Sequence, residues 1–248
     1  MLKVEGVEKS YKQGGLFSNE SQKIIKNVSF ECRNGECLGI IGESGSGKST
    51  LGRMLIGIEK PDCGNVLFEG KDVSSRRVRS GKISAVFQDY TSSINPFFTV
   101  EAAILEPMKS QISEREQSSR KVDQLLNRVG LDPSYRKKYP HELSGGEVQR
   151  VCIARAISTN PKCILLDEAV SSLDVSIQVQ ILDLLKDLKE SENMSYIFIT
   201  HDVQAAAYLC DRVIFFKDGR IEELLEISQL KNVKSEYAKK LLNSLLMF

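Results

Sequence analysis

Short apolar runs and longer amphipathic runs alternate along this chain. Apolar runs that end at glycine or at charged residues are typical of strands. They lie at 28–30, 37–41, 65–73, 82–88, 163–167, 196–200 and 212–216. Runs with helical spacing lie at 99–130, 146–158 and 176–191. Strands that alternate with helices in this way predict an α/β fold with a mostly parallel sheet.

The run at 176–191 has a particularly clear helical pattern. One face of the predicted helix collects apolar side chains, which we expect to pack on the core. These residues are Ile177, Ile181, Leu184, Leu185 and Leu188.

The order of these runs also predicts how the chain is organised. The N-terminal strands look antiparallel and predict a second, smaller sheet. The helical stretch lies between two parts in which strands and helices alternate. We therefore expect one domain over residues 1–248, with an α/β core at 1–90 and 160–248 and an inserted helical subdomain at about 91–159.

Composition narrows the class of protein. The chain is 41% hydrophobic and 27% charged, as in ordinary soluble globular proteins. It has 34 basic and 33 acidic residues, a net charge of +1, so we expect no nucleic-acid partner. The N-terminus does not resemble a signal peptide, and no apolar run approaches the roughly 20 residues of a membrane helix. Any membrane-spanning part must belong to another chain.

The chain has six cysteines, and none forms a C-x-x-C pair. We expect free, buried thiols in a reducing compartment. Cys32 and Cys37 are the only close pair, and a metal site there is the less favoured alternative.

The stretch "GESGSGKS" at 42–49, the phosphate loop, fits the pattern G-x-x-x-x-G-K-[ST]. It follows an apolar strand and opens a helical run, as this nucleotide-binding motif requires. Its backbone N–H groups and the helix N-terminus favour phosphate. Lys48 is expected to reach the β- and γ-phosphates, and the Ser49 hydroxyl to bind Mg²⁺. The residues expected to hold a nucleoside triphosphate here are Gly42, Glu43, Ser44, Gly45, Ser46, Gly47, Lys48, Ser49 and Thr50.

Polar side chains follow two other predicted core strands. Asp167 and Glu168 end the run "CILLDE", and His201 follows "YIFIT". In α/β sheets the carboxyl ends of the strands face the ligand crevice. We expect Asp167 to hold Mg²⁺, Glu168 to polarise the attacking water and His201 to contact the γ-phosphate.

A second glycine-rich stretch, "LSGGE" at 143–147, precedes a helical run. With the other motifs it resembles the ATP-binding cassette family of transporter ATPases, over nearly the whole chain. The motifs stand in the family's order: "GESGSGKST", "VFQD", "LSGGE", "CILLDE", "SSLD" and "ITHD". The resemblance implies a P-loop NTPase core of the RecA-like type with an antiparallel β subdomain and a helical subdomain.

The resemblance also implies a role for individual residues. "LSGGE", the signature loop, matches the loop that binds the γ-phosphate of ATP held by the opposite subunit, through Ser144, Gly145 and Gly146. Gln88 matches the glutamine that touches Mg²⁺ and senses the transmembrane partner. Further matches are Asp174 in the loop that crosses the dimer interface, His201 as the switch histidine and Tyr11 as the adenine-stacking aromatic.

Glu147 departs from the family pattern, which has glutamine at this position. A carboxylate near a phosphate site is unfavourable, but the first turn of a helix favours a glutamate. We expect the second effect to dominate, with the carboxylate turned away from the γ-phosphate.

The chain resembles the peptide/nickel importer subgroup in "YPHELSGGE", in "SSLDVSIQVQILDLL" and in the tail "SEYAKKLLNSLL". Ala169 and the short C-terminus favour nickel or metal-chelate import, with oligopeptide or dipeptide import as the alternative. The subgroup implies a heterodimer with a related ATPase subunit, two transmembrane permease subunits and an extracellular substrate-binding protein. The chain would then be a peripheral protein at the cytoplasmic face of the cell membrane.

Two other classes of function fit less well. Soluble family members in DNA repair or translation usually carry two cassettes or long coiled-coil inserts, which this chain lacks. A GTP-dependent switch would need an N-K-x-D motif, and the sequence has none.

Overall fold

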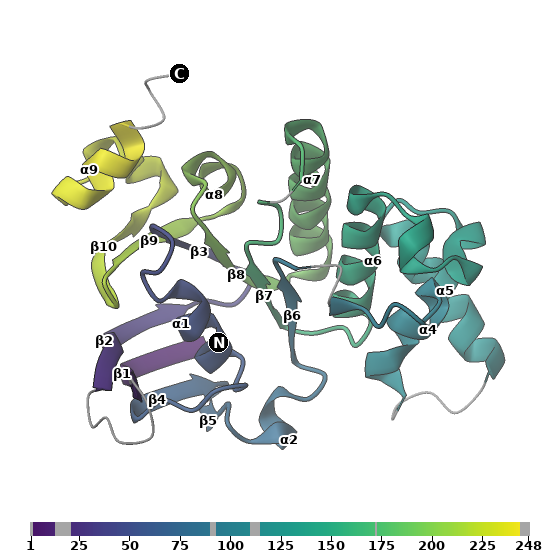
Figure 1. The fold of residues 1–248 in the computed structure, drawn as a ribbon, viewed down its shortest axis with the longest axis horizontal. Coiled ribbons are helices and arrows are strands. Elements are labelled where there is room, and N and C mark those ends of the chain that lie inside the picture. Colours follow the sequence, from purple (N-terminus) through teal and green to yellow (C-terminus); the bar gives the residue numbers. More distant parts are fainter. Residues whose placement is uncertain (1, 13–20, 90–92, 110–114, 172, 244–248) are drawn as a thin grey trace. The chain divides into compact units, whose positions relative to one another are not determined.

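The computed structural model describes residues 2–12, 21–89, 93–109, 115–171 and 173–243. The chain forms two compact units, whose elements are labelled in Figure 1. Unit 1 consists of Met1–Ser80 and Ser195–Phe248, and unit 2 of residues 81–194. The chain therefore leaves unit 1 after Ser80 and returns to it at Ser195. Parts of two quoted motifs lie outside the described residues: Ser172 in "SSLD" and 244–246 in the tail.

Unit 1 contains an antiparallel sheet with the strand order β2-β1-β4-β5 (Figure 1). Its strands are β1 (Leu2–Lys12), β2 (Ser21–Cys32), β4 (Cys63–Phe68) and β5 (Lys71–Asp72). In β2, Val28 and Phe30 are buried and Ser29 is exposed, so alternate side chains face the core. The predicted second sheet is confirmed.

The predicted strand at 65–73 is a hairpin instead of one strand. β4 and β5 are joined by Glu69 and Gly70, with φ of 52° and 76°. Two consecutive left-handed residues form the tight turn whose twist matches that of paired strands. The glycine allows the chain to reverse there, which the apolar pattern did not reveal.

The parallel strands of unit 1 carry its core. β3 (Cys37–Ile41) lies between β8 (Ser195–Thr200) and β9 (Arg212–Lys217) and is parallel to both. β10 (Arg220–Glu226) pairs antiparallel with β9. All residues of β3 and β8 are buried, as expected for strands covered on both faces. Because Ile41 pairs with Thr200, Gly42 and His201 leave the sheet at the same edge.

Short helices complete unit 1, and two of them pack on its strands. α1 contacts β2 and β8, and α8 contacts β3 and β8. The helices of this unit are α1 (Lys48–Leu55), α2 (Arg76–Arg79), α8 (Val203–Leu209), η4 (Ile227–Asn232) and α9 (Glu236–Asn243).

Unit 2 combines two parallel strands with helices. β6 (Ile83–Phe87) and β7 (Cys163–Asp167) pair in register, from Ile83 opposite Cys163 to Phe87 opposite Asp167. The helices are α4 (Val100–Leu105), η1 (Glu106–Met108), α5 (Arg115–Arg128), η2 (Pro133–Lys137), η3 (Pro140–Glu142), α6 (Gly145–Ile157) and α7 (Val175–Glu192). The helices predicted at 99–130, 146–158 and 176–191 are confirmed.

The buried face of α7 differs from the predicted one. Ile181, Leu185 and Leu188 are buried as expected, but Leu182 is buried too. Ile177 and Leu184 are only half-buried. Helical spacing allows either face, and packing against the rest of unit 2 turns the helix toward Leu182.

None of the six cysteines, all of which lie in the described part of the chain, forms a disulfide. Five are buried, whereas Cys63 is exposed at the start of β4. Cys37 lies beside Cys210, with 3.5 Å between the two sulfur atoms. Within the described part of the chain, no helix combines the length and apolarity needed to cross a bilayer.

Candidate active site

The phosphate loop joins β3 to α1 in unit 1. Lys48 is the first residue of α1, and its side chain lies back over the loop. Its ammonium donates to the carbonyl oxygens of Gly42 (2.7 Å) and Glu43 (2.8 Å). Gly47 precedes the helix with φ of 103°, which glycine adopts without steric strain. The loop therefore holds a buried positive charge at a helix N-terminus, an arrangement suited to an anion.

Ser46 shows that this loop fits a phosphate group. The residue is only 7% exposed, and its hydroxyl oxygen has no hydrogen-bond partner among the described residues. An unsatisfied buried hydroxyl costs about 1–3 kcal/mol. A phosphate oxygen in the loop would supply the missing partner.

Tyr11 and Thr50 are hydrogen-bonded by the same arginine, Arg53. Arg53 donates to the Thr50 hydroxyl (3.2 Å) and to the Tyr11 hydroxyl (3.5 Å). Tyr11 in turn donates to the carboxylate of Glu59 (2.5 Å) and is 38% exposed. Unit 1 thus connects Tyr11 to the first turn of α1, while exposed His201 leaves β8 at the edge where the phosphate loop begins.

Unit 2 places Gln88, Asp167 and Glu168 at one edge of its strand pair. Asp167 ends β7 opposite Phe87, so Gln88 and Glu168 are the next residues along the two parallel strands. Asp167 is 7% exposed, Glu168 is half-buried and Gln88 is exposed. The predicted core strand that ends at Asp167 is confirmed.

Glu168 has a strained backbone. Its φ is 52°, a value uncommon outside glycine and of order 1 kcal/mol in cost. The Ser171 hydroxyl donates to the carbonyl oxygen of Glu168 (2.9 Å), and the Ser171 N–H does so as well (3.2 Å). This turn holds the glutamate in one position, as expected where geometry matters for function.

The signature loop forms the start of α6, with Ser144 as its N-cap. The Ser144 hydroxyl accepts from the N–H of Glu147 (3.4 Å). The Glu147 carboxylate accepts from the N–H (2.7 Å) and the hydroxyl (2.8 Å) of Ser144. Glu147 therefore completes a capping box in the first turn, as the helix-dipole argument expects.

Asp174 lies at the start of α7, where it acts as the N-cap. Its carboxylate accepts from the N–H of Ile177 (3.0 Å) and the hydroxyl of Ser176 (2.7 Å). The Ile177 N–H, followed by the Ser176 hydroxyl, lowers the pKa of Asp174 below its ordinary value. The carboxylate therefore stays ionised and keeps the first turn of α7 in place at neutral pH.

Gly146 brings the signature loop against the start of α7. A Cβ atom at this position would lie 2.8 Å from Cγ2 of Ile177. Gln149 adds a contact from α6, donating to the carbonyl oxygen of Ala169 just after β7 (2.7 Å). Three segments that are separate in sequence, the signature loop, the end of β7 and the start of α7, are thus joined in unit 2.

Gly146→Ala is expected to lower the free energy of unfolding by about 1–3 kcal/mol and to reduce ATPase activity, because Ile177 must move to admit the new methyl group. Thermal unfolding and steady-state ATPase assays measure both effects. Ile177→Ala in the same chain should restore much of the lost stability. An unchanged Gly146→Ala protein would contradict the close packing.

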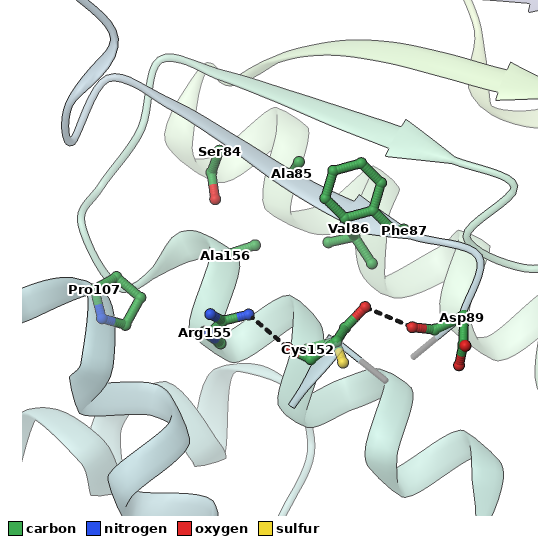
Figure 2. Close-up of a pocket in the computed structure, with 10 residues that line it drawn as sticks. Ser84, Ala85, Val86, Phe87, Asp89, Pro107, Cys152, Arg155 and Ala156 are labelled. Atoms are coloured by element: carbon green, nitrogen blue, oxygen red, sulfur yellow. Dashed lines mark hydrogen bonds between the residues drawn. The ribbon is translucent and has the colours of Figure 1, made fainter. Parts of the chain in front are cut away.

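Unit 2 also contains a cleft of ≈ 560 Å³ between β6 and α6 (Figure 2). Arg155 donates to the carbonyl oxygen of Ser93 (3.0 Å) and to the carboxylate of Glu106 (2.7 Å). Burial raises the pKa of Cys152 to about 12, so this thiol is neutral at physiological pH. Residues 84–87 of β6 line one side of the cleft. The other lining residues are Asp89, Ser93, Pro107, Cys152, Arg155 and Ala156.

Two tyrosines that contact these loops were not predicted. Tyr237 in α9 accepts a hydrogen bond from the N–H of Glu43 in the phosphate loop (2.9 Å). Tyr135 in η2 donates to the Glu147 carboxylate (2.5 Å). Neither tyrosine belongs to the motif that contains its partner. Spacing and periodicity therefore could not have identified these two contacts.

Comparison with known proteins identifies the family. A family model described as ABC transporter matches residues 25–171. The metal-staphylopine import system ATP-binding protein CntF of Staphylococcus aureus (strain NCTC 8325 / PS 47) is 52% identical, over 100% of this chain and 100% of that protein. The oligopeptide transport ATP-binding protein AppF of Bacillus subtilis (strain 168) is 41% identical, over 98% of this chain and 78% of that protein.

A solved structure supports the same assignment. The dimeric ATP-binding cassette MJ0796 in a post-hydrolysis state, bound to ADP and Pi, superposes with a TM-score of 0.82 at 31% identity. The match covers 92% of this chain and 99% of that one. The predicted fold class is confirmed, and the chain belongs to the ABC transporter family as an ATP-hydrolysing subunit.

Proposed function

We propose that this ATPase subunit powers the import of a metal chelate. The observation that carries the proposal is the 52% identity with CntF over the full length of both chains. AppF, a peptide-transport subunit, is 41% identical and is matched over only 78% of its length. Ala169, where peptide importers tend to carry proline, favours the same choice. Nickel import and peptide import are the alternatives.

In this proposal the phosphate loop, Tyr11 and His201 bind the nucleotide. Lys48 exchanges its two carbonyl partners for phosphate oxygens, which gives its buried ammonium an anionic partner. Tyr11 stacks on adenine with its hydroxyl held by Glu59. His201 donates to the γ-phosphate. Support comes from the unsatisfied Ser46 hydroxyl and from the shared edge at which β3 and β8 end.

Asp167 and Gln88 in unit 2 and Ser49 in unit 1 each carry an oxygen atom of the kind that Mg²⁺ prefers, and these residues would hold the ion. Mg²⁺, when bound, neutralises charge on the phosphate oxygens. Glu168 accepts a proton from the attacking water and so acts as the general base. Its strained, hydrogen-bonded turn supports this role, because strain of this kind concentrates at functional sites.

We also propose that two ATPase subunits work as a pair. Ser144, Gly145 and Gly146 would contact the γ-phosphate of ATP bound by the opposite subunit, and Asp174 would lie at the interface between subunits. Supporting features are the exposed Ser144 at the N-terminus of α6 and the dimeric state of the MJ0796 cassette. Neither loop alone completes the site, so ATP draws the two subunits together.

The pair would be a heterodimer with a related ATPase, at the cytoplasmic face of the membrane. Two permease subunits and an extracellular substrate-binding protein would complete the importer. A permease segment would enter the cleft of unit 2. Asp89, the residue after Gln88, lines this cleft. The buried Nε of Arg155 at this cleft lacks a partner among the described residues, so an acceptor on the permease would find a donor there.

An uptake assay in a deletion strain tests the substrate. Cells restored with this chain are expected to take up a metal chelate, and cells restored with Glu168→Gln are not. Free nickel and labelled oligopeptides are assayed in parallel, at matched expression levels. Uptake of peptides with no uptake of any metal species would contradict the proposal and favour the alternative.

Co-expression with the permease tests the heterodimer. We expect full substrate-stimulated ATPase activity only when the second, related ATPase is also present. A complex that contained two copies of this chain and hydrolysed ATP at the full rate would show that the heterodimer is wrong.

A further inference from the structure

Both carboxylate oxygens of Glu147 accept hydrogen bonds from other residues of unit 2. One oxygen accepts from the N–H and hydroxyl of Ser144, at 2.7 Å and 2.8 Å. The other accepts from the hydroxyl of Tyr135, at 2.5 Å. The single proton of the Ser144 hydroxyl is therefore donated to Glu147, and a hydroxyl has no second proton to give.

Tyr135 is held firmly in this position. It lies in η2, whose start is capped by Asp132. The next residue, Arg136, forms ion pairs with Glu101 of α4 (2.6 Å) and Asp123 of α5 (3.2 Å). One short turn is thus anchored to two helices, so the Tyr135 hydroxyl approaches Glu147 from a fixed direction.

The charges around this pair favour an ionised Glu147. The hydrogen bond from Tyr135 and then those from Ser144 lower the pKa of Glu147, with Lys138 contributing. The Lys138 ammonium also lies over the Tyr135 ring, 3.7 Å from its centre. A cation over the ring polarises the phenol and makes its hydroxyl a better donor. Glu147 therefore remains an anion whose charge is shared with Tyr135.

We propose that Tyr135 is a positioning residue for the signature loop, acting through Glu147 on the hydroxyl of Ser144. The inference rests on the proposed contact between Ser144 and the γ-phosphate. To donate to a phosphate oxygen, the Ser144 hydroxyl must release Glu147. Tyr135 lets this happen, because its own hydrogen bond keeps the carboxylate satisfied and fixed once the serine has turned away.

Without the Tyr135 hydroxyl, two effects oppose ATP. The carboxylate depends more on Ser144 as a donor and holds its proton more strongly. Its charge is also less compensated beside the anionic nucleotide. Both effects require the negative charge of Glu147, and this dependence separates a positioning role from a merely structural one.

Tyr135→Phe is expected to raise the ATP concentration for half-maximal ATPase activity by about tenfold, the effect of losing one hydrogen bond to a charged group, with a smaller change in kcat. The assay uses the full chain in its complex with its partner subunits. Glu147→Gln serves as the second background, and the effect of Tyr135→Phe in each background is measured relative to the protein that keeps Tyr135. In the Glu147→Gln background, Tyr135→Phe is expected to change the half-maximal concentration less than about twofold, since no carboxylate remains.

Ser144→Ala separates the two levels of the proposal. If Ser144→Ala abolishes ATPase activity but Tyr135→Phe has no effect, the role of Tyr135 is overturned while the proposed function stands. Equal effects of Tyr135→Phe in the wild-type and Glu147→Gln backgrounds would also overturn it. If Ser144→Ala has no effect, the proposed role of the signature loop fails, and that of Tyr135 with it. Thermal unfolding of each variant confirms that the comparison is made between folded proteins.

Discussion

Glu168→Gln is expected to slow ATP hydrolysis by about 10²- to 10⁴-fold while leaving ATP binding intact, because an amide cannot take a proton from water at neutral pH. The substitution keeps the size of the side chain and removes its charge. Glu168 directly follows β7 and is held in a strained turn by Ser171, so its position should survive the change. Steady-state ATPase rates and equilibrium ATP binding measure the two effects separately.

The same variant should accumulate in a nucleotide-bound dimer, since the γ-phosphate proposed to join the two subunits would no longer be removed. Size-exclusion chromatography with ATP detects this species. Glu190→Gln, a matched substitution at an exposed position of α7, is the control and should behave as wild type. Turnover near the wild-type rate in Glu168→Gln would show that another group is the general base.

Lys48→Ala is expected to weaken ATP binding by about 100-fold or more, because it removes charge-assisted hydrogen bonds worth about 1.5–3 kcal/mol each. Lys48 is 5% exposed at the start of α1, within reach of the loop that would hold the phosphates. No neighbouring residue of the loop can supply the same ammonium. Titration with a fluorescent ATP analogue gives the change in Kd.

The loss of the ammonium also frees the carbonyl groups of Gly42 and Glu43, so loop stability must be checked by thermal unfolding. Lys71→Ala, at an exposed lysine of β5, serves as the control for removal of one positive charge. If Lys48→Ala bound ATP with wild-type affinity and a wild-type unfolding temperature, the phosphate loop would not be the nucleotide site.

Much of the fold follows from local pattern. Continuous apolar runs such as "CLGII" and "CILLD" are buried parallel strands, because strands covered on both faces require apolar side chains throughout. The apolar pattern was less informative where more than one structure fits the same pattern. The strand predicted at 65–73 is a hairpin, because Glu69 and Gly70 turn the chain. The face of α7 is rotated toward Leu182, because packing selects among adjacent faces of one helix.

The candidate site divides in the same way. Phosphate loops and strand-end carboxylates are recognisable in sequence because each motif consists of consecutive residues. The comparisons confirm the family that these motifs indicated. The contacts around these motifs join residues that are far apart in the sequence. Gly146 needs to be glycine because Ile177 lies beside it, and Glu43 meets Tyr237 from a helix near the end of the described chain.

Glu147 shows most clearly which features can be predicted from the sequence and which require the tertiary structure. The sequence by itself determined the family, the phosphate loop and the place of Glu147 in the first turn of a helix, since each depends on neighbouring residues. Only the tertiary structure decided that Tyr135, twelve positions away, donates to this carboxylate. The reason is physical: a hydrogen bond depends on distance in space, and Arg136 helps to hold η2 in place through its ion pairs with α4 and α5.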